Sequence, residues 1–264
     1  MAESPADLEI QARLDRLFAT RTLITAFQPI CNLGTGEVVG AEALTRFVSS
    51  PFRSPDQWFV EADSIGRGRE LEFLALETAM QAAADLPGHI YAAVNLSPSA
   101  CLDPRLSDIV RNSGLNPGRI VVELTERSAV ADYARLAAAL APLRSAGVRI
   151  AIDDVGAGFS SMRHILRLSP ELIKLDRTIV AGIDSDPNQR ALCMAMVSFA
   201  SQIGASLVAE GIQTNAELAA VAEMGVNIGQ GYLLGRPSVL PSDWSRWRQR
   251  NRSSANGDAD SLDT

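Results

Sequence analysis

The chain has 264 residues, of which 47% are hydrophobic and 21% charged, a composition that excludes a disordered polypeptide and suits one large globular domain or two small ones. Its net charge of −7 argues against direct binding of nucleic-acid polymers. No apolar run is long enough for a transmembrane helix, no signal peptide is evident, and three scattered cysteines indicate reduced thiols, so we expect a cytoplasmic protein without membrane insertion.

In chain order, residues 8–19 first show the pattern of an amphipathic helix that leads into a strand. Eight short apolar runs follow, and their content of Val, Ile and Ala without alternation is typical of strands buried on both faces. The runs are 26–30, 37–44, 90–95, 119–126, 149–154, 171–176, 206–211 and 227–234. Helices are predicted between several of them, at 69–86, 132–147, 188–204 and 214–225. Residues 251–264 are polar, and we expect them to be disordered.

The alternation of strand, helix and glycine predicts βαβ units. Eight strands within residues 1–250 predict one domain with a closed (β/α)8 TIM-like barrel. An open doubly wound sheet is the alternative, but no G-x-G-x-x-G sequence follows an early strand.

Polar residues stand at the ends of nearly all these runs, and in a barrel such ends converge on the face where active sites form. They offer oxygen ligands without a cluster of His or Cys, a set that suits Mg²⁺ or Mn²⁺. Two adjacent aspartates could hold two ions, and a two-metal site promotes displacement at phosphorus. A lysine beside them could neutralise phosphate or orient water. The residues are Glu42, Asn95, Glu123, Asp153, Asp154, Lys174, Glu210 and Gln230.

Each of these residues also has a simpler interpretation when it is taken alone. Glu42 could be a solvated acid, Asn95 a turn former, and Lys174 the ion-pair partner of Asp176. A shared metal site accounts better for a polar residue at the same end of nearly every strand.

Sequence motifs at the same positions resemble those of a known family. FQPI is followed by GAEALTRF, with Glu42-Ala43-Leu44, and then by VNLS, ELTE, DDVGAG, IKLD, EGIQ and GQGYLLGRP. With these eight motifs in order the chain resembles the EAL-domain family, the cyclic di-GMP phosphodiesterases, over about residues 8–248. The resemblance implies a barrel with a reversed first strand and the hydrolysis of cyclic di-GMP to the linear dinucleotide.

The resemblance also implies roles for individual residues. One metal ion would be held by Glu42, Asn95, Glu123 and Asp153, and a second, again Mg²⁺ or Mn²⁺, with help from Asp153 and Asp154. Lys174 and Glu210 would position or deprotonate the attacking water, and Gln230 would orient these groups. Substrate would be contacted by Gln28, Leu44, Arg46, Gln213 and Pro237. Glu126 would anchor the loop after Asp154 and link metal binding to the contact of a homodimer.

The chain departs from the family pattern at several positions. Val155 and Ala157 stand where Phe and Thr are usual, and Gln213 replaces a Glu. The alternative function is therefore a catalytically weak module that binds cyclic di-GMP and signals to a regulatory protein partner. Degenerate members lose acids from the ligand set, whereas this chain has all of them, which favours the enzyme.

Overall fold

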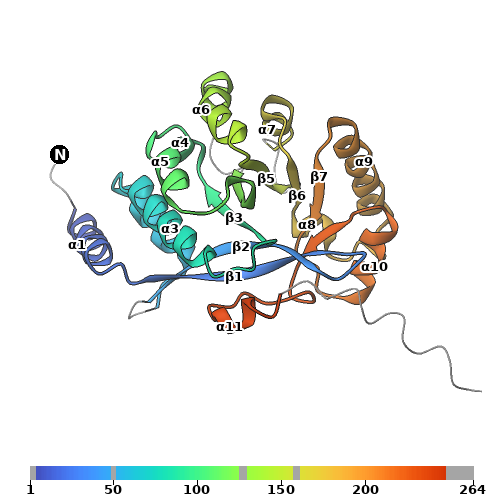
Figure 1. The fold of residues 1–264 in the computed structure, drawn as a ribbon, viewed down its shortest axis with the longest axis horizontal. Coiled ribbons are helices and arrows are strands. Elements are labelled where there is room, and N and C mark those ends of the chain that lie inside the picture. Colours follow the sequence, from blue (N-terminus) through green and yellow to red (C-terminus); the bar gives the residue numbers. More distant parts are fainter. Residues whose placement is uncertain (1–3, 49–51, 125–129, 157–160, 248–264) are drawn as a thin grey trace, which may run out of the picture.

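The strands of the computed structural model, which describes residues 4–48, 52–124, 130–156 and 161–247, close into a barrel in the order β1 to β8 (Figure 1). The predicted barrel is thereby confirmed. The predicted polar tail falls outside the described residues. The strands are β1 (Leu23–Asn32), β2 (Val38–Phe47), β3 (Tyr91–Leu96), β4 (Ile120–Leu124), β5 (Arg149–Val155), β6 (Leu172–Leu175), β7 (Ser206–Ala209) and β8 (Ile228–Gln230).

The first strand runs against the others. β1 pairs antiparallel with both β2 and β8, whereas the neighbouring pairs from β2 to β8 are parallel. This confirms the reversed first strand. The register places Gln28 opposite Glu42 and Ile30 opposite Gln230, so β1 brings a glutamine beside the acid of β2.

Helices cover the outside of the barrel, and the segment that ends in α11 lies along β1 (Figure 1). The expected helices are all present within a few residues, and the structure adds short ones that the periodicity did not predict, chiefly α2, α5 and α7. The helices are α1 (Pro5–Thr20), α2 (Pro55–Ser64), α3 (Gly68–Ala83), α4 (Pro98–Cys101), α5 (Arg105–Asn112), α6 (Tyr133–Ser145), α7 (Ser161–Leu168), α8 (Arg177–Val180), α9 (Pro187–Ile203), α10 (Asn215–Glu223) and α11 (Pro241–Trp244), with a 3-10 turn η1 (Pro117–Arg119). No helix in the described ranges combines the length and apolar character that a membrane span needs.

The barrel interior is apolar at its lower levels and polar at its mouth. Ile30, Tyr91, Ala93, Val121, Ala151, Leu172 and Val208 form one buried cluster inside the barrel. A larger cluster lies between the strands and the outer helices. Side chains two residues apart in a strand point to the same face, so in the parallel strands β3 to β7 the residues two positions after Ala93, Val121, Ala151, Leu172 and Val208 line the mouth. The fold thus collects polar groups from separate strands at one place.

Candidate active site

The inward-facing positions at the carboxyl ends of five consecutive strands carry the predicted polar residues. Each stands two positions after a residue of the inner cluster, and so its side chain rises from the same wall of the barrel. The residues are Asn95, Glu123, Asp153, Lys174 and Glu210. Glu42 of β2 and Gln230 of β8 complete the ring. Glu42 contacts Asn95 and Lys174, and Gln230 donates a hydrogen bond to Glu42.

Lys174 lies at the centre of the ring and is 1% exposed. Its Nζ is 2.8 Å from Glu123 Oε2, 3.0 Å from Asp153 Oδ1, 2.8 Å from Glu210 Oε1 and 3.8 Å from Glu42 Oε2. Four carboxylates therefore face one ammonium. Lys174 is also the only lysine of the chain, whose other basic residues are arginines. A compact ammonium with three donors suits this convergence better than a planar guanidinium.

Two amides fix the carboxylate of Glu42. Asn95 Nδ2 donates to Glu42 Oε1 at 2.9 Å, and Gln230 Nε2 donates to Glu42 Oε2 at 2.6 Å. With their nitrogens used in this way, both amides keep their oxygens as acceptors. Gln230 Oε1 is buried without a hydrogen-bond partner, which makes it an oxygen suited to a cation or to water.

The acids of the site form two groups that share Asp153. Ligand oxygens of Glu42, Glu123 and Asp153 lie within 4.8 Å of one another, and so do those of Asp153, Asp154 and Glu210. Adjacent residues of a regular strand point to opposite faces. Here a register shift between Ile152 and Val155 and a left-handed φ of 54° at Asp154 allow both aspartates to face the same site.

These residues fit divalent cations. Asp153 Oδ1 is buried and has only the ion pair with Lys174, without a hydrogen bond of good geometry, and Gln230 Oε1 has no partner. Clustered carboxylate and amide oxygens are the donors that Mg²⁺ and Mn²⁺ prefer. Buried acids in excess over the single ammonium must otherwise hold protons.

The pKa values of the site follow from this excess of buried acids. Burial raises the pKa of Glu210 to about 8, although Lys174 opposes the rise. Burial likewise raises the pKa of Glu123 well above its usual range. Burial alone would lower the pKa of Lys174, but Asp153, Glu123 and the other two carboxylates outweigh it and raise that pKa. The lysine thus stays charged, and protons are retained by the acids around it.

Two clefts meet at Asp153 and Asp154, which line both of them. The smaller cleft, of about 350 Å³, is also lined by Gln28, Glu42, Glu210, Gln213 and Gln230. The larger cleft, of about 730 Å³, is lined by Leu44, Arg46 and Asn95 and by residues of α2 and α3. The structure therefore brings together most of the residues that the sequence singled out. Pro237 is half-buried but is not among the residues that line either cleft. Glu126 and Ala157 lie outside the described residues.

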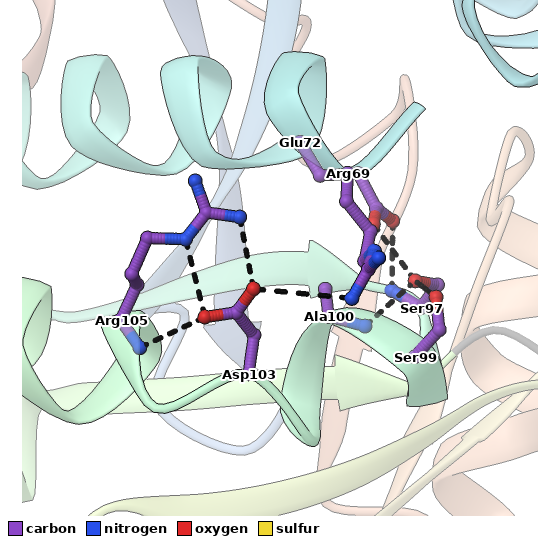
Figure 2. Close-up of polar contacts among 7 residues, drawn as sticks. All are labelled: Arg69, Glu72, Ser97, Ser99, Ala100, Asp103 and Arg105. Carbon is purple, nitrogen blue, oxygen red and sulfur yellow. Dashed lines mark hydrogen bonds and ion pairs between the residues drawn. The ribbon is translucent and has the colours of Figure 1, made fainter. Parts of the chain in front are cut away.

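The wall of the larger cleft contains charged residues that the sequence reasoning did not single out (Figure 2). Glu72 of α3 accepts hydrogen bonds from Ser97 N at 2.9 Å and Ser97 Oγ at 2.7 Å, and so ties α3 to the turn that follows Asn95. Burial raises the pKa of Glu72. Arg69 lies one turn earlier in α3, and its Nη1 is 3.9 Å from Asp103 Oδ2 (Figure 2). Asp103 also forms an ion pair with Arg105.

The smaller cleft also has lining residues that the sequence reasoning missed, among them Asp176, Arg177 and Tyr232. Asp176 accepts from Thr178 N at 2.8 Å and caps α8. The one signal in the sequence for Arg177 was its position two residues after the end of the strand that carries Lys174, where side chains can reach the cleft.

Comparisons with known proteins give a consistent picture. A family model described as "EAL domain" matches residues 11–237. The chain is 30% identical to the probable cyclic di-GMP phosphodiesterase PdeB of Escherichia coli, over 90% of this chain and 47% of that protein. It is 30% identical to the cyclic di-GMP phosphodiesterase RocR of Pseudomonas aeruginosa, over 80% of this chain and 56% of that one. The chain thus spans about half the length of these curated relatives.

A solved structure, the PaMucR phosphodiesterase in complex with c-di-GMP, superposes on the chain with a TM-score of 0.78 at 29% identity. The match covers 89% of this chain and 99% of that one. The structure of an EAL enzyme, Bd1971, in a form with cAMP and cyclic di-GMP bound, gives a TM-score of 0.82 at 24% identity and supports the fold.

Proposed function

The chain belongs to the EAL domain family, and from that premise we propose that it is a metal-dependent phosphodiesterase that hydrolyses one phosphodiester bond of cyclic di-GMP to give the linear dinucleotide. One observation carries the proposal: two groups of acids share Asp153 at the point where two clefts meet. A ligand with two nucleotides could occupy both clefts and present a phosphodiester to the acids between them.

We assign these residues to two cation sites. Glu42, Asn95, Glu123 and Asp153 would hold one ion, and Asp153 with Asp154 would hold the other. Bound Mg²⁺ or Mn²⁺ supplies positive charge at the phosphate and a water of lowered pKa. Such charge is needed here because the diester and the carboxylates are all anionic.

Lys174 and Glu210 are the groups that would act on water. The Glu210 carboxyl, with its pKa raised to about 8 by burial, could hold or accept a proton near neutral pH. Lys174 contacts Glu210, Asp153 and Glu123 within 3.0 Å, and so keeps their oxygens in fixed positions. Gln230 and Asn95 do the same for Glu42. Preorganised groups of this kind lower the barrier because they need not reorient during the reaction.

The nucleotide would be held from both clefts. Arg46 and Leu44 supply a cation and an apolar surface in the larger cleft, and Gln28 and Gln213 supply amides in the smaller one. Gln28 Nε2 donates to Gly235 O at 3.1 Å, which leaves its oxygen available as an acceptor. Pro237 would contribute to a base pocket near this loop.

The test is to incubate the purified protein with cyclic di-GMP, with and without Mg²⁺ or Mn²⁺, and to separate the products by chromatography. Appearance of the linear dinucleotide only with metal supports the proposal. Binding of cyclic di-GMP without any product in either metal would contradict it and favour a binding module that signals to a partner protein.

The homodimer and its link to the metal site through Glu126 are further proposals that rest on family membership. A cytoplasmic location is proposed from the three scattered cysteines of the sequence. Light scattering of the purified protein tests the dimer directly. If dimerisation supports activity, specific activity should fall as the protein is diluted below its dimer dissociation constant.

A further inference from the structure

Arg177 is the cation of the smaller cleft. It begins α8, directly after Asp176, and its side chain is exposed. The other charged residues that line this cleft, among those the structure describes, are acids: Glu42, Asp153, Asp154, Asp176 and Glu210. A single guanidinium therefore shares this cleft with five acids, three of which, Glu42, Asp153 and Asp154, we assign to the metal ions.

The guanidinium is held in one orientation. Arg177 Nη1 donates to Gly211 O at 3.1 Å, and Nη2 donates to Gln213 Oε1 at 3.0 Å. The side chain lies across Gly211, where an added Cβ would come within 2.7 Å of Arg177 Cβ and Cγ. Two of the five N–H donors are used in these contacts, and the others remain for a ligand in the cleft that Arg177 lines.

The partner that holds this guanidinium is neutral. Within the described ranges Arg177 has no ion pair, and its two acceptors, the Gly211 carbonyl and the side-chain amide of Gln213, are both neutral. Two nearby acids are committed to backbone amides: Glu217 accepts from Gly182, Gln213 and Thr214, and Asp176 accepts from Thr178. A glutamate at position 213 would place a carboxylate where the amide oxygen now lies and would neutralise the cation.

We propose that Arg177 binds a phosphate group of the dinucleotide in the smaller cleft, and that Gln213 sets the strength of this contact because it orients the guanidinium without neutralising it. The inference rests on the proposed function and extends it to a residue that determines affinity. The guanidinium fork matches phosphate oxygens in shape and charge. A dinucleotide that spans both clefts then meets Arg46 on one side of the aspartates and Arg177 on the other.

A double-mutant cycle tests the inference with Gln213→Glu, Arg177→Met and the double variant. The dissociation constant of cyclic di-GMP is measured in Ca²⁺, which we expect to support binding without turnover, and kcat and KM are measured in Mn²⁺. Arg177→Met should raise the dissociation constant and KM by roughly tenfold or more, the scale of a lost charge-assisted hydrogen bond. Gln213→Glu should raise them about 3- to 10-fold in the natural chain, but less than about twofold when Arg177 is absent. In both single variants kcat should change little.

Controls separate this role from a structural one. Arg190→Met removes an arginine of α9 whose partner is Glu223, and it should leave affinity unchanged. Added salt should weaken binding by the natural chain more than binding by Gln213→Glu, a comparison that still decides the matter if Arg177→Met does not fold. Binding of 5′-GMP, but not of guanosine, should be weakened by Arg177→Met.

Three results would overturn the inference: equal effects of Gln213→Glu with and without Arg177, a loss of kcat at constant affinity, or equal weakening of guanosine and 5′-GMP, which would indicate contact with the base. If the natural chain binds cyclic di-GMP without hydrolysing it, the proposed function fails while the binding cycle still decides this inference. If it does neither, both fail.

Discussion

Replacement of Lys174 by methionine should destabilise the metal-free protein strongly. Methionine keeps the length of the side chain but removes the ammonium on which four carboxylates converge. Removal of one partner of a buried ion pair costs about 3–5 kcal/mol, and Lys174 is 1% exposed, so little solvent screening reduces this figure. For a domain of this size the loss corresponds to a fall in Tm of roughly 6–20 °C.

The loss should depend on pH and on metal. Without Lys174, the acids around it can be protonated or left as uncompensated charges. Protonation is easier at low pH, so the destabilisation should grow between pH 6 and pH 8. Mn²⁺ supplies the missing positive charge, and it should therefore restore more stability to the variant than to the natural protein.

The assay is thermal and urea unfolding in EDTA at both pH values, repeated with Mn²⁺. Arg190→Met serves as the control, because an exposed ion pair contributes only about 0–1 kcal/mol. A loss below about 1 kcal/mol at pH 8 in EDTA would refute the reasoning, since it is less than the scale for breaking a buried pair. So would a loss that is the same at pH 6 and pH 8.

Four further predictions follow from the site. Activity should require Mg²⁺ or Mn²⁺ and fall to background in excess EDTA, while Ca²⁺ should inhibit because it is larger and takes more ligands; turnover that persists in EDTA speaks against the metal site. Glu42→Ala should mainly lower kcat and Arg46→Ala should mainly raise KM, and steady-state kinetics that show the same change in both would contradict these roles. The pKa of Glu210 is higher in the folded metal-free protein than in the unfolded chain, so this carboxyl contributes stability that is present below pH 4.5 and is lost as pH rises through about 8. The free energy of unfolding, measured in EDTA across this range, should show the loss. Glu210→Gln should reduce this pH dependence. Glu72→Ala should destabilise the protein by about 1 kcal/mol because it leaves the partly buried Ser97 N–H without its acceptor. Glu77→Ala on the same helix removes only an ion pair with Arg21 and should have little effect in the same unfolding assay.

The sequence indicated the mouth of the barrel well, for a physical reason. Runs such as residues 149–154 are apolar because both strand faces are buried. A polar residue at the same end of nearly every such run is better explained by a shared site than by separate surface roles. Because side chains alternate between the two faces of a strand, the sequence then indicates which of them face inward. The same reasoning could not tell that Lys174 lies at the centre of the acids, since its contacts depend on the positions of four other strands.

Residues that helices and turns contribute were harder to predict. Glu72 lies within a helix whose periodicity reports only its apolar face, and nothing local reveals that its carboxylate reaches Ser97. Helix α2 was missed although its start was readable: Ser54, Pro55 and Gln57 form a capping box with proline at the first helical position. Arg177 was missed because its role depends on contacts with Gly211 and Gln213, more than thirty positions away.

The single lysine of the chain has a practical consequence, because it lies at the centre of the candidate site. Protein grown with lysine labelled with ¹³C at the ε-carbon would give one resonance from this chain, which needs no assignment. Its chemical shift reports whether the amine is charged, and its linewidth reports exchange at the barrel mouth. Titration with Mg²⁺ or a nucleotide would then be followed at the centre of the site, at a carbon bonded to the nitrogen that contacts the carboxylates, in a chain that contributes no other lysine signal.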